Sequence, residues 1–345
     1  MSREPGVYLD FAASSPCDPR VIDAMLPYFA AEFGNPSSRV YAHGLRAHVA
    51  VEDAREQAAQ LIGCLPGDVV WTSGATEANN LAIRGFVKAA ARRGSDANGQ
   101  LLTALNEHPS VLMTMRDLER DGWATSYLRP SPSGVVTARL VEQALCSDTA
   151  LVSIMAANNE LGTLNEVAEI GDLCRRRGIV FHCDATQWVG KLPFDVHAMQ
   201  VDLLSWSGHK IYGPKGVGAL YVRPNPPLPL APVATGGGQE RGLRAGTPNV
   251  PAVVGFGLAC ELCCRLLDRE AVRLTGLRDR LEALLTSAVD GVVVNGSGAR
   301  RAPHISSLTF ALDAECDLVE ELRPYGVFRP ARVVEGAGPP TTVVG

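Results

Sequence analysis

The middle of the chain alternates short apolar runs with longer amphipathic segments. The apolar runs lie at 68–72, 100–105, 149–155, 178–183, 201–205 and 218–222, and segments of helical periodicity lie at 80–93, 113–122 and 167–177. Strands that alternate with helices are typical of a mostly parallel sheet with helices on both faces. This alternation predicts an α/β fold.

A proline-rich segment, 224–232, interrupts this alternation, and a glycine-rich loop (GGGQERGLRAG) follows it. A long helix is then expected from about Pro251, followed by strands at 292–294 and 304–310 and a helix at 315–322. Such a break predicts a domain boundary. We expect a large domain over 15–250, and a smaller α+β domain formed by 1–14 together with 251–345.

Composition excludes several classes of partner. The net charge is -5, and an acidic surface attracts neither nucleic acid nor an anionic membrane. The N-terminal residues have no apolar signal core, and no window approaches the long uncharged run that a membrane span needs. We therefore expect a cytoplasmic protein.

The cysteines predict reduced thiols. There are nine, an odd number, scattered through the chain. Cys260, Cys263 and Cys264 lie close together, which raises the alternative of half a metal site. They fall in a helix-like apolar run, however, and no second Cys/His pair follows at zinc-finger spacing. Buried core cysteines are the favoured interpretation, and no metal is expected.

Polar residues follow four of the apolar runs, at 73–77, 158–160, 184–187 and 207–210. Ligands bind at the carboxyl ends of strands in open α/β sheets, so we expect these segments to converge. Taken singly, each has a plainer interpretation: a helix N-cap, a turn, or a solvated loop lysine. Their occurrence after successive strands favours a common site.

The residue types at these strand ends are chemically complementary. Small residues with Thr76 at a helix N-terminus suit an anion. Asp184 suits a protonated ring nitrogen, and Lys210, in a chain with few lysines, can form a Schiff base with a carbonyl. Phosphate, ring nitrogen and aldehyde are the three handles of pyridoxal 5'-phosphate (PLP), so the sequence predicts a PLP site.

Several motifs give the sequence a family resemblance: YLDFAASSP, FGNPSS, TSGATEANN, NEHPSV, NNELG, HCDATQ, SGHKIYGPKGVGAL and GGGQERGLRAGT. From about Tyr8 to Leu322 it resembles the cysteine desulfurases, the NifS-like group of class V aminotransferases, which also includes selenocysteine lyases. The resemblance implies PLP fold type I, an α/β fold with a mostly parallel central sheet and a smaller α+β domain, truncated here at its C-terminus. The same resemblance implies a homodimer that takes sulfur from L-cysteine to give alanine.

The resemblance also assigns roles residue by residue. It implies that Lys210 holds the cofactor covalently, that Asp184 pairs with the ring nitrogen, and that His108 stacks on the ring and shuttles protons. The remaining assignments are Asn159 and Gln187 to the ring hydroxyl, Ala75, Thr76, Ser207 and His209 to the phosphate, Thr247 to the phosphate of a partner subunit, and Asn35 to the substrate carboxylate.

The sequence departs from the family near its C-terminus. The family places a persulfide-forming cysteine on a loop that corresponds here to 326–336 (GVFRPARVVEG), and no cysteine follows Cys316. Members of the family also extend beyond the point that matches Gly345, and that segment carries an arginine for the substrate carboxylate. The interpretation therefore includes alternatives: a selenocysteine lyase-like or β-eliminating PLP enzyme, or an inactive homologue that binds a partner. A sulfur-acceptor protein is a further expected partner.

Overall fold

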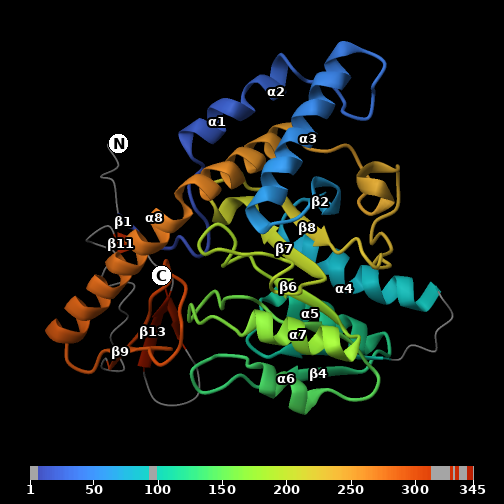
Figure 1. Cartoon of the computed structure of the whole chain (residues 1–345). Helices are drawn as coiled ribbons and strands as arrows, with labels where there is room; N and C mark the ends of the chain where they lie inside the picture. The colour runs from blue at the N-terminus through green and yellow to red at the C-terminus, as the bar shows by residue number, and fades with distance from the viewer. Residues whose placement is uncertain (1–6, 93–98, 312–326, 329–330, 334–339, 345) are drawn as a thin grey trace.

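The computed structural model describes residues 7–92, 99–311, 327–328, 331–333 and 340–344. Its centre is a seven-stranded sheet in the order β2-β8-β7-β6-β5-β3-β4 (Figure 1). The strands are β2 (Val69–Thr72), β3 (Gln100–Ala104), β4 (Thr125–Leu128), β5 (Thr149–Ser153), β6 (Val180–Asp184), β7 (Leu203–Ser207) and β8 (Gly218–Val222). Only β8 runs antiparallel to its neighbours within this sheet, which confirms the predicted mostly parallel α/β fold.

Helices cover both faces of this sheet. Helices α4 (Ala75–Arg92) and α5 (Pro109–Arg120) pack on one face, where Ile83 and Met115 meet Leu101. The other face carries α3 (Ala42–Ile62), α7 (Val167–Arg177) and the start of α8 (Val250–Ala288). Shorter helices complete the layers: α1 (Pro19–Met25), α2 (Pro27–Ala30) and α6 (Ala138–Ala144). Strands buried between two helix layers explain the nearly continuous apolar runs of the sequence.

Most expected elements occur, with shifted ends. The predictions for α7 and β8 are confirmed to the residue, whereas α4 begins at Ala75 rather than near residue 80, and β7 lies at 203–207 rather than 201–205. Helix α3 was not predicted. Its buried face is built largely of alanines, such as Ala47, Ala54 and Ala58, which give only a weak apolar periodicity.

Helix α8 crosses α3 at very close range. A Cβ atom added at Gly257 would lie 2.5 Å from Cα of Ala54, so the two backbones meet where only glycine fits. By length and composition alone α8 could cross a membrane, because one 18-residue window has a mean hydropathy of 1.7. The statement that no window approaches such a run is therefore wrong. The apolar residues at its N-terminal end, including Phe256 and Cys260, pack into the main core.

The remaining described strands form two small sheets. One has the order β12-β13-β10-β9, from β9 (Val293–Val294), β10 (Ser307–Ala311), β12 (Ala331–Val333) and β13 (Pro340–Val344). In the other, β1 (Val7–Tyr8) pairs in parallel with β11 (Val327–Phe328). This pairing joins the N-terminal segment to the C-terminal region, as expected if residues 1–14 and 251–345 form one small domain. The division into these two domains stays a prediction. The expected helix at 315–322, Cys316 and most of the loop 326–336 lie outside the described residues.

Candidate active site

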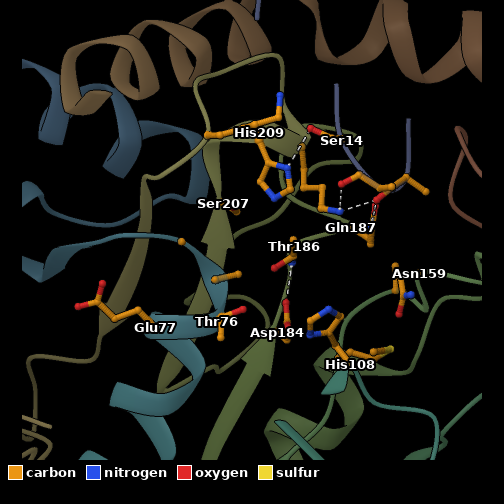
Figure 2. A pocket seen from close by; sticks show the side chains of 18 of the residues that line it. Ser14, Thr76, Glu77, His108, Asn159, Asp184, Thr186, Gln187, Ser207 and His209 are labelled. Carbon is orange, nitrogen blue, oxygen red and sulfur yellow. Dashed lines mark hydrogen bonds between the residues drawn. The ribbon is translucent and has the colours of Figure 1, made fainter. Parts of the chain in front are cut away.

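The polar segments predicted to converge do so around one cavity of about 800 Å³. Figure 2 shows several of its lining side chains pointing toward a common space at the ends of the central strands. The predicted residues that line the cavity are Ala75, Thr76, His108, Asn159, Asp184, Gln187, Ser207, His209 and Lys210. Sequence reasoning thus placed the cavity correctly, while the role of each residue in it stays a prediction.

Two predicted residues lie elsewhere. Neither Asn35 nor Thr247 lines this cavity, and both are exposed in the single chain. Oδ1 of Asn35 accepts a hydrogen bond from the backbone N–H of Ser37, 2.9 Å away, as in a local turn. Their predicted roles therefore require either a second copy of the chain or another arrangement of these loops.

One side of the cavity suits an anion. The first turn of α4 faces it with Ala75 and Thr76, and first-turn backbone N–H groups have no partner within their own helix. Ser207 and His209 lie on the neighbouring wall. Burial, together with Lys210 and Lys215, lowers the pKa of His209 to about 4, so this imidazole is neutral at physiological pH. A neutral ring remains able to donate one N–H.

A buried chain of hydrogen bonds joins Asp184 to His108. The amide nitrogen of Asn79 donates to Oδ2 of Asp184 at 2.7 Å and to Oγ of Ser110 at 2.8 Å. Nδ1 of His108 lies 2.7 Å from Oγ of Ser110 and accepts the backbone N–H of the same serine at 3.1 Å. Because a backbone N–H can only donate, Nδ1 is unprotonated, and a neutral His108 carries its proton on Nε2. The same chain holds Asp184 and His108 in fixed orientations.

The amine of Lys210 is held by the N-terminal segment. Its Nζ donates to the carbonyl oxygens of Ala12 and Ala13, at 2.5 Å and 2.7 Å. Burial lowers the pKa of Lys210, although Asp10 and Asp184 act in the opposite direction. A partly desolvated lysine with a lowered pKa is the form that attacks carbonyl carbons.

Gln187 connects the cavity to the C-terminal part of the chain. Its Nε2 donates to the carbonyl of Ala12 at 2.8 Å, and its Oε1 lies 3.0 Å from Nε2 of His304. Thr186, next to it, lines the cavity with a buried Oγ1 that has no hydrogen-bond partner among the described residues. An unsatisfied hydroxyl at this position is suited to a polar ligand.

A buried carboxyl group lies beneath the site. Oε1 of Glu107 accepts the backbone N–H of Met155 at 2.6 Å, and Oε2 has no partner within the described part of the chain. Burial raises the pKa of Glu107 well above its usual value, and the charge of Asp184 raises it further. Its surroundings therefore favour the protonated, neutral form of Glu107.

Sequence reasoning missed several of these residues. Asn79, Ser110 and Glu107 lie inside the quoted motifs TSGATEANN and NEHPSV, so the motifs could have drawn attention to them. The sequence does not show which residues they contact. No pattern in the sequence links His304 to the site, since 117 residues separate it from Gln187.

The comparisons with known proteins assign the chain and its fold to a family. The family model for class V aminotransferases matches residues 7–328. The cysteine desulfurase IscS of Anaeromyxobacter dehalogenans is 50% identical over 305 residues, which are 88% of this chain and 74% of that protein. The chain belongs to the cysteine desulfurase family. The mitochondrial cysteine desulfurase of Drosophila melanogaster is 48% identical over 88% of the chain and 65% of that protein.

Solved structures of cysteine desulfurase relatives agree with the fold. A NifS-like protein superposes with a TM-score of 0.88 at 35% identity, covering 95% of this chain and 88% of that one. The structure named SspA in complex with cysteine has a TM-score of 0.82 at 36% identity, covering 96% and 89%. These likenesses confirm PLP fold type I for the chain, and the family is PLP-dependent.

The residues of this chain fit the family cofactor. The cavity presents an amine, a carboxylate and an anion-binding helix end, and its unsatisfied Thr186 hydroxyl offers a further polar contact. No cysteine lines the cavity among the residues that the structure describes. The described thiols with shifted pKa values, such as Cys183 beneath the site, have them raised by burial, which keeps them protonated.

Proposed function

We propose that this chain is a PLP-dependent enzyme that removes sulfur from L-cysteine and releases alanine. The observation that carries the proposal is the convergence of Lys210, Asp184 and the first turn of α4 on one cavity, in a chain that shares 50% identity with a cysteine desulfurase. The SspA structure was solved with cysteine, which supports the substrate class. Sulfur supply for iron–sulfur clusters or thio-cofactors is the expected role.

Each group in the cavity then has a defined task. Bound PLP supplies an electron sink for carbanion chemistry. Lys210 would hold the cofactor through its aldehyde and would move a proton at the substrate Cα, for which its lowered pKa suits it. Asp184 would pair with the ring nitrogen, since its oxygens accept hydrogen bonds from Asn79 and from the N–H of Thr186, which orient the carboxylate.

His108 and Gln187 serve as hydrogen-bond donors in this proposal. His108 presents its Nε2–H rather than a free acceptor, because Nδ1 is already engaged by Ser110. Gln187 lines the cavity, and its second amide N–H, which is not used by Ala12, would donate to the ring oxygen of the cofactor. Asn159 lines the same cavity, and Ala75, Thr76, Ser207 and His209 would hold the phosphate.

The thiol that receives the sulfur lies outside the described cavity lining. Since no described cysteine reaches the cavity, we propose that sulfur leaves to a thiol from another segment, from an acceptor protein or from solution. The test is to incubate purified protein and PLP with L-cysteine and to assay alanine, pyruvate and sulfide separately. Alanine formation that depends on an added thiol is expected, whereas pyruvate and ammonia as the main products would show β-elimination instead.

A homodimer would complete this site. Large apolar side chains are exposed on α1, α2 and α3 and on the segments between them: Ile22, Leu26, Phe29, Phe33, Tyr41, Leu45 and Val49. Exposed apolar side chains that cluster on one surface mark interfaces. The exposed Thr247 and Asn35 would then serve the cavity of a second copy. Light scattering at micromolar protein tests this, and a monomer would contradict it.

A second candidate function follows from the absence of a cysteine among the described residues that line the cavity. A homologue that binds PLP or a partner without turnover needs no such cysteine, and it would show a cofactor absorption band with no alanine produced from L-cysteine. Location in the cytoplasm stays a prediction from the sequence.

A further inference from the structure

A second cavity, of about 320 Å³, lies against α8. It shares no lining residue with the candidate active site. One wall is a single face of α8, where Leu262, Leu266 and Leu274 recur at helical spacing. The opposite wall includes Val21 of α1 and Ile211. The cavity is thus largely apolar.

One buried amine faces this apolar space. The side chain of Lys191 lines the cavity and the residue is only 8% exposed. Its Nζ lies 4.7 Å from the ring centroid of Tyr212, a cation–π contact. Among the residues that the structure describes, no hydrogen bond or ion pair reaches this Nζ. A largely buried ammonium group without a hydrogen-bond acceptor from the protein is stabilised by an anion that contacts it, so Nζ is a point where a ligand acceptor could bind.

The other charged side chains around the cavity are already paired. Arg20 forms an ion pair with Asp18 at 2.7 Å, and Arg273 forms one with Glu270 at 2.6 Å. In the described part of the chain, Lys191 is therefore the cavity-lining cation with no carboxylate in contact.

The neighbouring thiol does not serve as the counter-ion. Burial raises the pKa of Cys263 to about 11, although Lys191 acts to lower it, so Cys263 is a neutral thiol at physiological pH. Burial also lowers the pKa of Lys191, against smaller opposite effects of Cys263 and Glu270. An entering anion would reverse this penalty on the ammonium form.

We propose that this cavity binds a small carboxylate with an apolar body, separately from the active site. Its carboxylate would accept hydrogen bonds from Nζ of Lys191, and its body would pack on the leucines of α8. An inorganic anion would leave the leucine wall in contact with water, and a neutral apolar molecule would leave Lys191 without an acceptor. Only a ligand with both a carboxylate and an apolar body contacts Lys191 and the leucines of α8 favourably.

A matched pair of probes tests the proposal on the PLP-loaded protein. We would titrate 4-phenylbutyrate and its neutral twin, 4-phenylbutanamide, by calorimetry while recording the visible spectrum of the cofactor. The carboxylate should bind at least about tenfold more tightly than the amide and leave the spectrum unchanged. Equal affinities would overturn the proposal, as would a spectral change showing that the probe enters the first cavity.

Two variants locate the binding site. Lys191→Met should abolish the preference for the carboxylate and leave the amide affinity within about twofold, whereas Lys88→Met, which alters a lysine outside this cavity, should change neither affinity. Leu266→Trp fills the cavity and should abolish binding of both probes. Should Lys191→Met fail to fold, the tryptophan variant still decides, because binding retained in it overturns the assignment.

Discussion

Nε2 of His304 lies 3.0 Å from the amide oxygen of Gln187 and connects the C-terminal part of the chain to the candidate active site. The amide nitrogen of Gln187 donates to the carbonyl of Ala12, and a carbonyl only accepts, so the orientation of the amide is set. His304 must then donate from Nε2. Burial, with the charges of Lys191, Lys210 and Arg278, lowers the pKa of His304 well below its usual value, which keeps the ring neutral.

Replacement of His304 should weaken cofactor binding. In His304→Phe the amide oxygen of Gln187 loses its buried donor, at a cost of about 1 kcal/mol or roughly fivefold in PLP affinity. His304→Gln retains an N–H donor and should recover most of the affinity. Fluorescence titration of the apo protein with PLP measures both. Equal losses in the two variants would show that His304 acts through packing alone.

The buried amide of Asn79 should contribute to stability as well as to the site. Asn79→Leu removes the donor to Asp184 and the donor to Ser110, leaving a buried carboxylate oxygen without this partner. We expect a loss of about 1–3 kcal/mol in the free energy of unfolding, measured by urea denaturation. A free energy within about 0.5 kcal/mol of the parent protein would contradict this role.

Replacement of the two lysines of the first cavity should have different effects on cofactor binding. Lys210 is half-buried and donates hydrogen bonds to the carbonyls of Ala12 and Ala13, whereas Lys215 lines the same cavity but is exposed. Lys210→Met should abolish the visible absorption band of protein incubated with PLP, and Lys215→Met should retain it. A band that persists in Lys210→Met after dialysis would refute the proposed covalent attachment.

A buried ion pair near the C-terminal end of α8 should contribute strongly to the free energy of unfolding. Arg301 contacts both carboxylate oxygens of Glu282, at 2.6 Å and 2.7 Å, and Ser306 donates to the same carboxylate. Because both side chains of the pair are 9% exposed, Glu282→Ala leaves a buried charge and should cost about 3–5 kcal/mol.

The matched control for this pair is Glu142→Ala. Glu142 pairs with Arg177 on the surface, where both side chains are more than half exposed, and its loss should cost below about 1 kcal/mol. Thermal unfolding compares the two variants. Similar shifts in melting temperature for both would argue against a stabilising role of burial at Glu282.

Acid should destabilise the protein through His182. This imidazole lies between Ser153 and Ser205, at 2.8 Å and 3.0 Å, and burial lowers its pKa to about 4 despite the opposing charge of Asp184. The unfolded chain binds the proton at the ordinary pKa of about 6.5, so this contribution is complete above that pH and declines toward pH 4. The unfolding free energy should fall by about 1–2 kcal/mol between pH 7.5 and 5, and by less in His182→Gln. The same pH dependence in both proteins would exclude His182 as the cause.

The sequence predicted elements with a strong apolar pattern better than elements that pack through small residues. Strand β8 and helix α7 have strong apolar patterns, and their bounds were predicted correctly. Helix α3 buries mainly alanines, and its close contact with α8 depends on Gly257, a relationship between distant segments that periodicity does not reveal. The hydrophobic periodicity of a helix is weak wherever its packing relies on small residues.

The amino-acid sequence by itself determined the parallel sheet and the chemistry at its strand ends, because period and residue type are local properties. Lys210, Asp184 and Thr76 could be singled out from their positions after apolar runs alone. Only the tertiary structure decided which partners hold them, such as Asn79 for Asp184, 105 residues away. It also created the second cavity around Lys191. A hydrogen bond or a cavity wall needs atoms within a few ångströms, and that proximity arises only when separate elements pack together.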